Sequence, residues 1–210
     1  MMQTIGIYGG SFNPIHLGHI EKLKRLDALC HFNEVFFLPC SEHAFKEKSL
    51  ISTNHRLAML KLALTDVHFK IDAQELLRTG KSYTIDTLKQ YRKNYGHDVS
   101  LSFIMGHDAF CHFMQWQKFD FILNHAHIIL LSRPDHRCEF SQDLLNYMRK
   151  HQAHDLNLIN QKSCGYIFDV QEQDYPYSST EIRADLQAQK KPLGLDPRVY
   201  KYIKQHQLYR

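Results

Sequence analysis

The feature that most constrains the fold is a strand that runs directly into a glycine pair and then a helix, close to the start of the chain. Residues 3–8, QTIGIY, predict a strand that ends at Gly9-Gly10. Apolar residues then recur at helical spacing, at Leu17, Ile20, Leu23, Leu26 and Leu29. Strand, glycine turn and helix together predict one unit of an α/β sheet.

Strand and helix signals alternate along the rest of the chain. The predicted strands are 35–38, 69–73, 101–105, 127–131 and 166–170. The predicted helices are one capped by Ser52 or Thr53, one over 83–95, one from the Ser178 region to about 189, and one over 197–206. Residues 135–165 carry weaker signals and predict a helix with a loose connection.

This alternation implies a mostly parallel sheet covered by helices on both faces. We expect a Rossmann-like, doubly wound α/β fold with a small C-terminal helical part. We expect residues 1–210 to form a single domain, with 178–210 as its helical subregion.

The composition is that of a globular protein, with 43% hydrophobic and 23% charged residues in a chain of 210. The net charge of +4 suits a small anionic ligand and is too low for a nucleic-acid-binding tail. The longest apolar stretch, near 126–131, is too short to span a bilayer. We therefore expect neither a nucleic acid nor a membrane as partner.

Cysteine usage and the N-terminal sequence predict a location. The five cysteines include no CxxC pair, so neither a disulfide framework nor a four-thiolate zinc site is indicated. The first ten residues, MMQTIGIYGG, lack the basic and apolar regions of a signal peptide. A cytoplasmic protein is expected.

The segment GGSFNPIHLGH, from Gly9 to His19, has the properties of a phosphate site. Its two leading glycines let backbone N–H groups approach an anion, and the helix behind them presents its positive end. It is neither a Walker loop nor GxGxxG. His16 and His19 are three residues apart, so both imidazoles can lie on one face and donate to phosphate oxygens. Either histidine alone would be read first as a cap or surface residue.

Other strand ends carry residues with two interpretations each. Gly106-His107-Asp108 suits a turn, or an aspartate that accepts hydrogen bonds from a ribose. Ser178-Ser179-Thr180 with Arg183 is first a helix cap, but can also clamp a polyphosphate. Trp116 is a core residue or a stacking surface for a base. The histidine pairs 125/127 and 151/154 are expected at the surface.

Two of these segments together resemble a known superfamily. GGSFNPIHLGH and YSSTEIR are similar to the HxGH and ISSTxxR motifs of the nucleotidyltransferases. Further similarity, spanning nearly the whole chain, is to bacterial nicotinate-nucleotide adenylyltransferases. It is carried by SYTIDTL at 82–88, Gly106-His107-Asp108, Trp116, residues 122–127, Arg133-Pro134 and the final QLYR.

The resemblance implies a role for each matching residue. The site for ATP and the mononucleotide would be lined by Gly9, Gly10, Ser11, Phe12 and Gly18. The ATP phosphates would be held by His16 and His19, the triphosphate clamped by Ser179, Thr180 and Arg183, and the adenosine contacted by Gly106 and Asp108. The acceptor mononucleotide would be bound by Phe12, Asn13, Lys46, Tyr83, Thr84, Trp116 and Arg133.

The implied reaction transfers AMP from ATP to nicotinate mononucleotide, giving nicotinate adenine dinucleotide and pyrophosphate in NAD biosynthesis. The attacking 5′-phosphate is already an anion, so the protein acts by alignment and charge neutralisation. The cations expected to do this are His16, His19, Lys46 and Arg183. Mg²⁺ would arrive bound to ATP, and no metal site of the protein's own is expected. A homo-oligomer is compatible with the sequence.

One loop departs from the family pattern and leaves alternatives open. The family commonly has Pro-Pro-His-Lys/Arg after the strand that ends at Pro39, whereas this chain has His43-Ala44-Phe45-Lys46. That loop is closer to nicotinamide-mononucleotide adenylyltransferases, so the amide or both substrates are the alternative. A phosphopantetheine acceptor is disfavoured by SYTIDTL and Trp116, which suit a flat aromatic ring. A non-catalytic nucleotide-binding module is disfavoured by the intact set of phosphate-neutralising residues.

Overall fold

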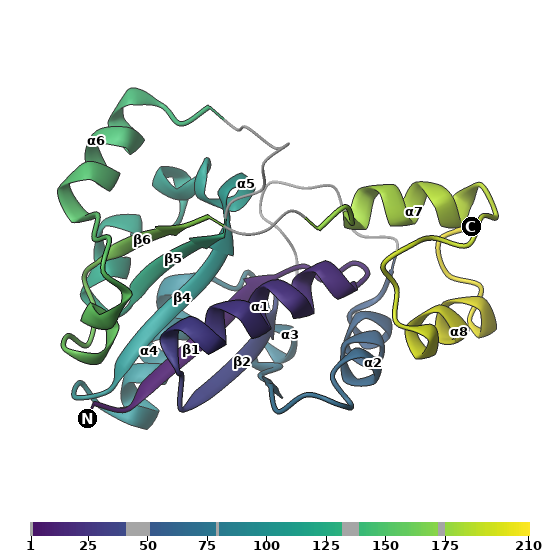
Figure 1. Cartoon of the computed structure of the whole chain (residues 1–210), viewed down its shortest axis with the longest axis horizontal. Helices are drawn as coiled ribbons and strands as arrows, with labels where there is room; N and C mark the ends of the chain where they lie inside the picture. The colour runs from purple at the N-terminus through teal and green to yellow at the C-terminus, as the bar shows by residue number, and fades with distance from the viewer. Residues whose placement is uncertain (1, 41–50, 79, 132–138, 172–174) are drawn as a thin grey trace.

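The computed structural model describes residues 2–40, 51–78, 80–131, 139–171 and 175–210. Within them, parallel strands form a six-stranded sheet in the order β3-β2-β1-β4-β5-β6 (Figure 1). The strands are β1 Thr4–Gly10, β2 Glu34–Pro39, β3 Lys70–Ile71, β4 Ser100–Gly106, β5 His127–Leu131 and β6 Ile167–Val170. This is the doubly wound Rossmann order, which confirms the predicted fold class.

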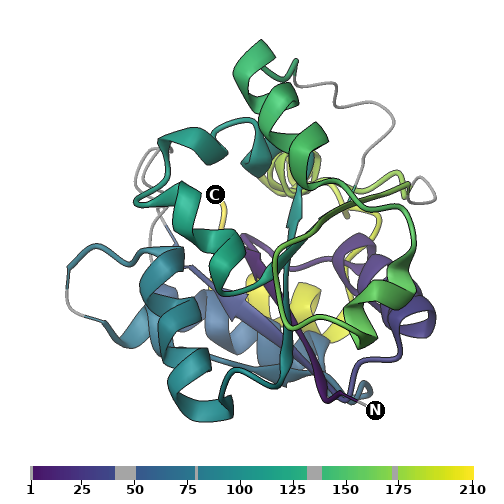
Figure 2. The same ribbon diagram turned by 90° about the vertical axis from the view of Figure 1, so that its left-hand side faces the viewer.

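Helices cover both faces of the sheet (Figures 1 and 2). The α-helices are α1 Leu17–Cys30, α2 Thr53–Ala63, α3 Gln74–Leu77, α4 Thr84–Tyr95, α5 His107–Phe110, α6 Gln142–His151, α7 Ser179–Gln187 and α8 Pro197–Gln205. Short 3₁₀ helices are η1 Phe113–Gln115, η2 Phe119–Asn124 and η3 Leu156–Asn160. None of the helices in the described part of the chain is both long and apolar enough to cross a membrane.

Alternating side chains along the central strands build two cores. In β4, Phe103 faces the core that contains Leu88 of α4, whereas Ile104 faces the core that contains Leu23 of α1. Strand β5 alternates in the same way, and all five of its residues are buried. Because both faces are covered, the strands are near-continuous apolar runs.

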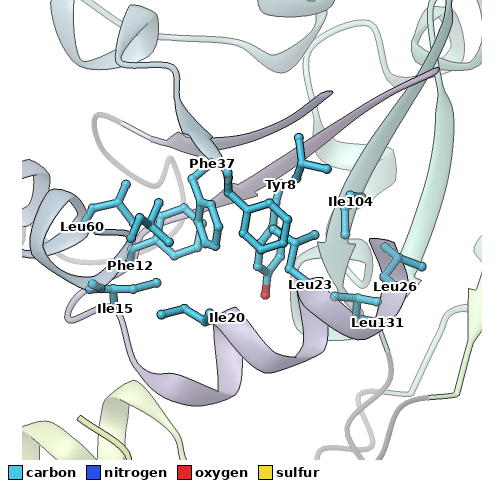
Figure 3. Packing of buried hydrophobic residues seen from close by; sticks show 14 of the residues in the cluster. Tyr8, Phe12, Ile15, Ile20, Leu23, Leu26, Phe37, Leu60, Ile104 and Leu131 are labelled. Atoms are coloured by element: carbon cyan, nitrogen blue, oxygen red, sulfur yellow. The ribbon is translucent and has the colours of Figure 1, made fainter. Parts of the chain in front are cut away.

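The first core extends to the loop between β1 and α1. Phe12 in this loop is 1% exposed, and its ring lies 5.2 Å from that of Phe37. Figure 3 shows Phe12 close to Ile15 and Leu60. The loop is therefore anchored in the hydrophobic core, although it also borders the ligand cavity described below.

Most predicted elements are confirmed, and their ends differ by one or two residues. Ser52 is the N-cap of α2, and its hydroxyl accepts a hydrogen bond from the His55 N–H. The strand predicted over 69–73 is shorter, because only Lys70–Ile71 pair with β2. The short helices α3, α5, η1 and η2 were not predicted, since each is too short to show a helical period. The subregion 178–210 contains α7 and α8, and its status as a separate part stays a prediction.

The structure corrects two expectations. His127 is not at the surface but is 0% exposed within β5. Cys111 is disulfide-bonded, whereas Cys30, Cys40 and Cys164 form no disulfide, so the cysteine pattern did not exclude a disulfide. The cytoplasmic location stays a prediction.

The two ring nitrogens of His127 have complementary partners. Its Nδ1 accepts from the Tyr166 N–H at 3.1 Å, so its Nε2 carries the proton and donates to the Lys162 carbonyl at 2.9 Å. Burial lowers its pKa to about 4. The folded protein therefore holds His127 neutral.

We predict that His127 makes stability depend on pH. In the unfolded chain a histidine titrates near 6.5, so below that pH the unfolded state binds a proton that the folded state excludes. The free energy of unfolding should fall by up to about 3 kcal/mol between pH 7 and pH 4 on this account, measured by urea unfolding. His127→Gln should be less stable at pH 7 but have a flatter pH profile, whereas the exposed control His154→Gln should keep the parental slope. An unchanged slope in His127→Gln would contradict the assignment.

Candidate functional site

A cavity of about 1120 Å³ lies at the carboxyl ends of the central strands, where ligands bind in open α/β sheets. Every described residue that was predicted as a site residue lines it. These are Gly9, Gly10, Ser11, Phe12, Asn13, His16, Gly18, His19, Tyr83, Thr84, Gly106, Asp108, Trp116, Ser179, Thr180 and Arg183. Lys46 and Arg133 lie outside the described residues.

Two glycines are required by close packing at the cavity wall. A Cβ on Gly9 would lie 2.6 Å from the ring of Phe103. A Cβ on Gly18 would lie 3.0 Å from Nδ1 of His16. The absence of side chains therefore allows β1 to end close against β4, and the His16 ring to lie on the first turn of α1.

The two histidines lie together at the start of α1, as their spacing predicted. His16 is the N-cap, and its ring centroid is 3.7 Å from that of His19. The His16 backbone N–H donates to Nδ1 of His19 at 3.3 Å, so a neutral His19 carries its proton on Nε2. The pair lies at the positive end of the helix, where an anion is favoured.

Donors from distant parts of the chain hold the loop before these histidines. Arg56 of α2 donates to the Ser11 carbonyl at 2.9 Å. Arg183 of α7 donates to the Asn13 carbonyl at 2.8 Å, and the Ser179 hydroxyl donates to the Pro14 carbonyl at 3.0 Å. The β1–α1 loop is thus fixed by α2 on one side and α7 on the other.

The first turn of α7 serves both as a cap and as part of the cavity wall. Ser178 is the cap, since its hydroxyl accepts from the Glu181 N–H at 3.1 Å and donates to the Glu181 carboxylate at 2.7 Å. Thr180 accepts from Arg183 at 3.1 Å. Ser178 is thus the helix cap, and it lines the cavity together with the three residues predicted as the clamp, Ser179, Thr180 and Arg183.

Aromatic groups and a helix start form another part of the wall. The half-buried Trp116 packs edge-on against Phe103, with 6.2 Å between ring centroids. Tyr83 is the N-cap of α4, but its side chain makes no capping hydrogen bond. Backbone N–H groups in the first turn of α4, beside Thr84, therefore remain as donors for a ligand. This part of the cavity suits a flat ring that carries an anionic or polar substituent.

Sequence reasoning missed a buried network behind that helix start. Glu75 is 6% exposed and accepts from the Thr87 hydroxyl at 2.7 Å. Arg78 donates to Thr87 at 2.9 Å and to the Ser82 hydroxyl at 3.2 Å. Burial raises the pKa of Glu75. Isolated polar residues in a short helix gave no sequence signal for this network.

The charges around the cavity favour an anionic ligand. Among its described lining residues, Lys22, Arg56, Arg183 and Arg210 are basic and Glu75 and Asp108 are acidic. Lys22 and Arg56 were not predicted. The position of Lys22, one turn after His19 on α1, could have indicated it, whereas Arg56 lies in a helix remote in sequence from the loop it binds.

Cys40 also lines the cavity but is no nucleophile. Burial raises its pKa to about 11, so it is a neutral thiol at pH 7. Within the described residues, no three His, Cys, Asp or Glu side chains gather into a metal site.

The chain is similar in sequence to a known protein family and to named bacterial proteins. A family model described as "Cytidylyltransferase-like" matches residues 7–185. The "Probable nicotinate-nucleotide adenylyltransferase" of Legionella pneumophila (strain Paris) is 34% identical over 211 residues, covering 99% of this chain and 100% of that protein. The protein of the same name from Hahella chejuensis is 35% identical, covering 98% of this chain and 95% of that protein.

A solved structure shows the same fold. Plasmodium falciparum nicotinic acid mononucleotide adenylyltransferase, complexed with NaAD, has a TM-score of 0.74 to this chain at 20% identity. The likeness covers 99% of this chain and 97% of that one. A structure of the P. falciparum enzyme complexed with APC has a TM-score of 0.72.

Proposed function

Because the chain belongs to the cytidylyltransferase-like family and, within it, to the nicotinate-nucleotide adenylyltransferases, we propose that it transfers AMP from ATP to nicotinate mononucleotide. The products are nicotinate adenine dinucleotide and pyrophosphate, a step of NAD biosynthesis. The observation that carries the proposal is a single cavity lined both by the His16–His19 pair and by Tyr83, Thr84 and Trp116.

In this proposal the 5′-phosphate of the mononucleotide attacks the α-phosphorus of ATP in line. The new P–O bond forms as the bond to pyrophosphate breaks, and no covalent enzyme intermediate is needed. The positive ends of α1 and α7 and the side chain of Arg183 neutralise the phosphate charge, and the rings of His16 and His19 donate N–H groups to the phosphate oxygens. Lys46 is proposed as a further cation.

The two substrates occupy different parts of the cavity. We assign the adenosine side to Gly106 and Asp108, and the pyridine side to Tyr83, Thr84 and Trp116, with Arg133 near the mononucleotide. Mg²⁺ is brought by ATP, since Mg²⁺ prefers phosphates and water to an all-protein cage. The partners of the protein are thus small molecules.

The experiment that tests the function is initial velocity of pyrophosphate release with ATP and each pyridine mononucleotide. We predict that kcat/KM for the acid exceeds that for the amide by about 10²-fold or more. Backbone donors at the start of α4 suit both carboxylate oxygens, whereas an amide NH₂ leaves one donor facing another. A ratio near one, or one favouring the amide, would show that the 40–48 loop is the better guide to specificity. No release with either mononucleotide would favour a non-catalytic nucleotide-binding module.

His19 is predicted to contribute to the chemical step. Removing a preorganised donor near the phosphates should lower kcat by about 10²-fold in His19→Ala, with little change in the KM for the mononucleotide. Steady-state kinetics measures both constants. The exposed control His154→Ala should behave as the parent. A folded His19→Ala variant with normal kcat would remove His19 from the mechanism.

Arg183 is predicted to act on ATP. Two of its donors hold Asn13 and Thr180, which leaves others for a phosphate. Arg183→Lys keeps the charge but loses the planar fork, so the KM for ATP should rise about tenfold while that for the mononucleotide changes little. Arg149→Lys, on the exposed part of α6, is the matched control. Unchanged ATP kinetics would leave Arg183 with a structural role only.

A further inference from the structure

The last residues of the chain reach the loop that precedes the histidine pair. The Tyr209 hydroxyl donates to Oδ1 of Asn13 at 2.5 Å, although the two residues are 196 positions apart. Tyr209 and its neighbours Gln207, Leu208 and Arg210 line the cavity. In Figure 1 the C-terminus lies at the same end of the molecule as α7 and α8. The tail is therefore part of the site wall.

The backbone of the tail is held in a conformation that its local sequence does not favour. At the end of α8, Gln207 has φ 53°, which belongs to a Schellman cap: Leu208 N–H donates to the Ile203 carbonyl and Gln207 N–H to the Lys204 carbonyl. Tyr209 has φ 60°, beyond the cap. Helix capping does not explain this second left-handed residue, so tertiary contacts hold it.

The surroundings of Tyr209 supply those contacts. The residue is only 8% exposed and belongs to the core cluster on the α1 side of the sheet. Burial raises its pKa, while the nearby positive charges of Arg183 and Arg56 oppose that rise. Tyr209 thus lies near both arginines that donate to the loop carbonyls of Ser11 and Asn13.

We propose that Tyr209 is a positioning residue for the reaction, which acts by holding the Asn13 side chain and with it the loop that leads to His16. The proposal rests on the proposed function. The loop carbonyls of Ser11, Asn13 and Pro14 are fixed by other donors, whereas Tyr209 fixes the side chain of Asn13. A site that loses this contact keeps its residues but loses their alignment, which lowers the rate.

The first test is Tyr209→Phe, which removes only the hydroxyl. We expect kcat/KM for the mononucleotide to fall about tenfold, equivalent to ~1.4 kcal/mol, at a temperature where circular dichroism shows the variant fully folded. The matched control is Tyr202→Phe. Its hydroxyl bonds His55 at 2.9 Å and links α8 to α2, but Tyr202 does not line the cavity. The control should lose stability and keep its kinetic constants. Parental kinetics in folded Tyr209→Phe, or equal losses in both variants, would overturn the proposal.

A double-mutant cycle separates positioning through Asn13 from a general structural effect. In an Asn13→Ala background, Tyr209→Phe should cause no further loss of kcat/KM. Full additivity of the two losses would overturn the proposal.

A binding measurement separates this proposal from the proposed function. If the parent releases no pyrophosphate with either mononucleotide, the proposed function fails. The same cycle is then measured by calorimetric titration with ATP. Tyr209→Phe should raise the Kd of ATP at least threefold in the parental background and leave it unchanged in Asn13→Ala. An unchanged Kd in both backgrounds would overturn the positioning role.

Discussion

The site depends on how the loop between β1 and α1 is held. The loop spans residues 11–16, between the end of β1 and the start of α1. A buried carbonyl without a donor costs about 1–3 kcal/mol, and Arg56, Ser179 and Arg183 supply donors at the carbonyls of this loop. Phe12 fixes the same loop by inserting its ring into the core. Hydrogen bonds and apolar packing therefore determine together where the histidine pair lies.

The sheet explains why the cavity is where it is. Alternate residues of β4 and β5 are buried in two separate cores. A shift of either strand by one position would move each of its side chains into the opposite core, so the register is fixed. The carboxyl end of β4 is thereby fixed between the ends of β1 and β5. Polar groups at those ends, such as Asp108, point into the resulting crevice because the faces of the sheet are already covered.

Burial also decides which titratable groups take no part in proton or nucleophile chemistry. His127 and Cys40 are both kept neutral by burial, the first inside β5 and the second beside the cavity. Glu75 is buried too; it accepts a hydrogen bond from the Thr87 hydroxyl, which in turn accepts one from Arg78. In the proposed mechanism the histidine pair, Lys46 and Arg183 act on the phosphates, which suits a reaction whose nucleophile is already an anion.

The sequence by itself determined the alternation of strands and helices, the parallel sheet and the two segments GGSFNPIHLGH and YSSTEIR, because these depend on local periodicity and short spacings. All the site residues that the sequence predicted and the structure describes line one cavity, because the carboxyl ends of parallel strands meet at one edge of the sheet. Only the tertiary structure decided that Arg56 and Tyr209 hold the loop, across 45 and 196 residues. It also decided that His127 is buried. Such contacts depend on how the packed elements meet in space, and no local pattern of residues encodes that meeting.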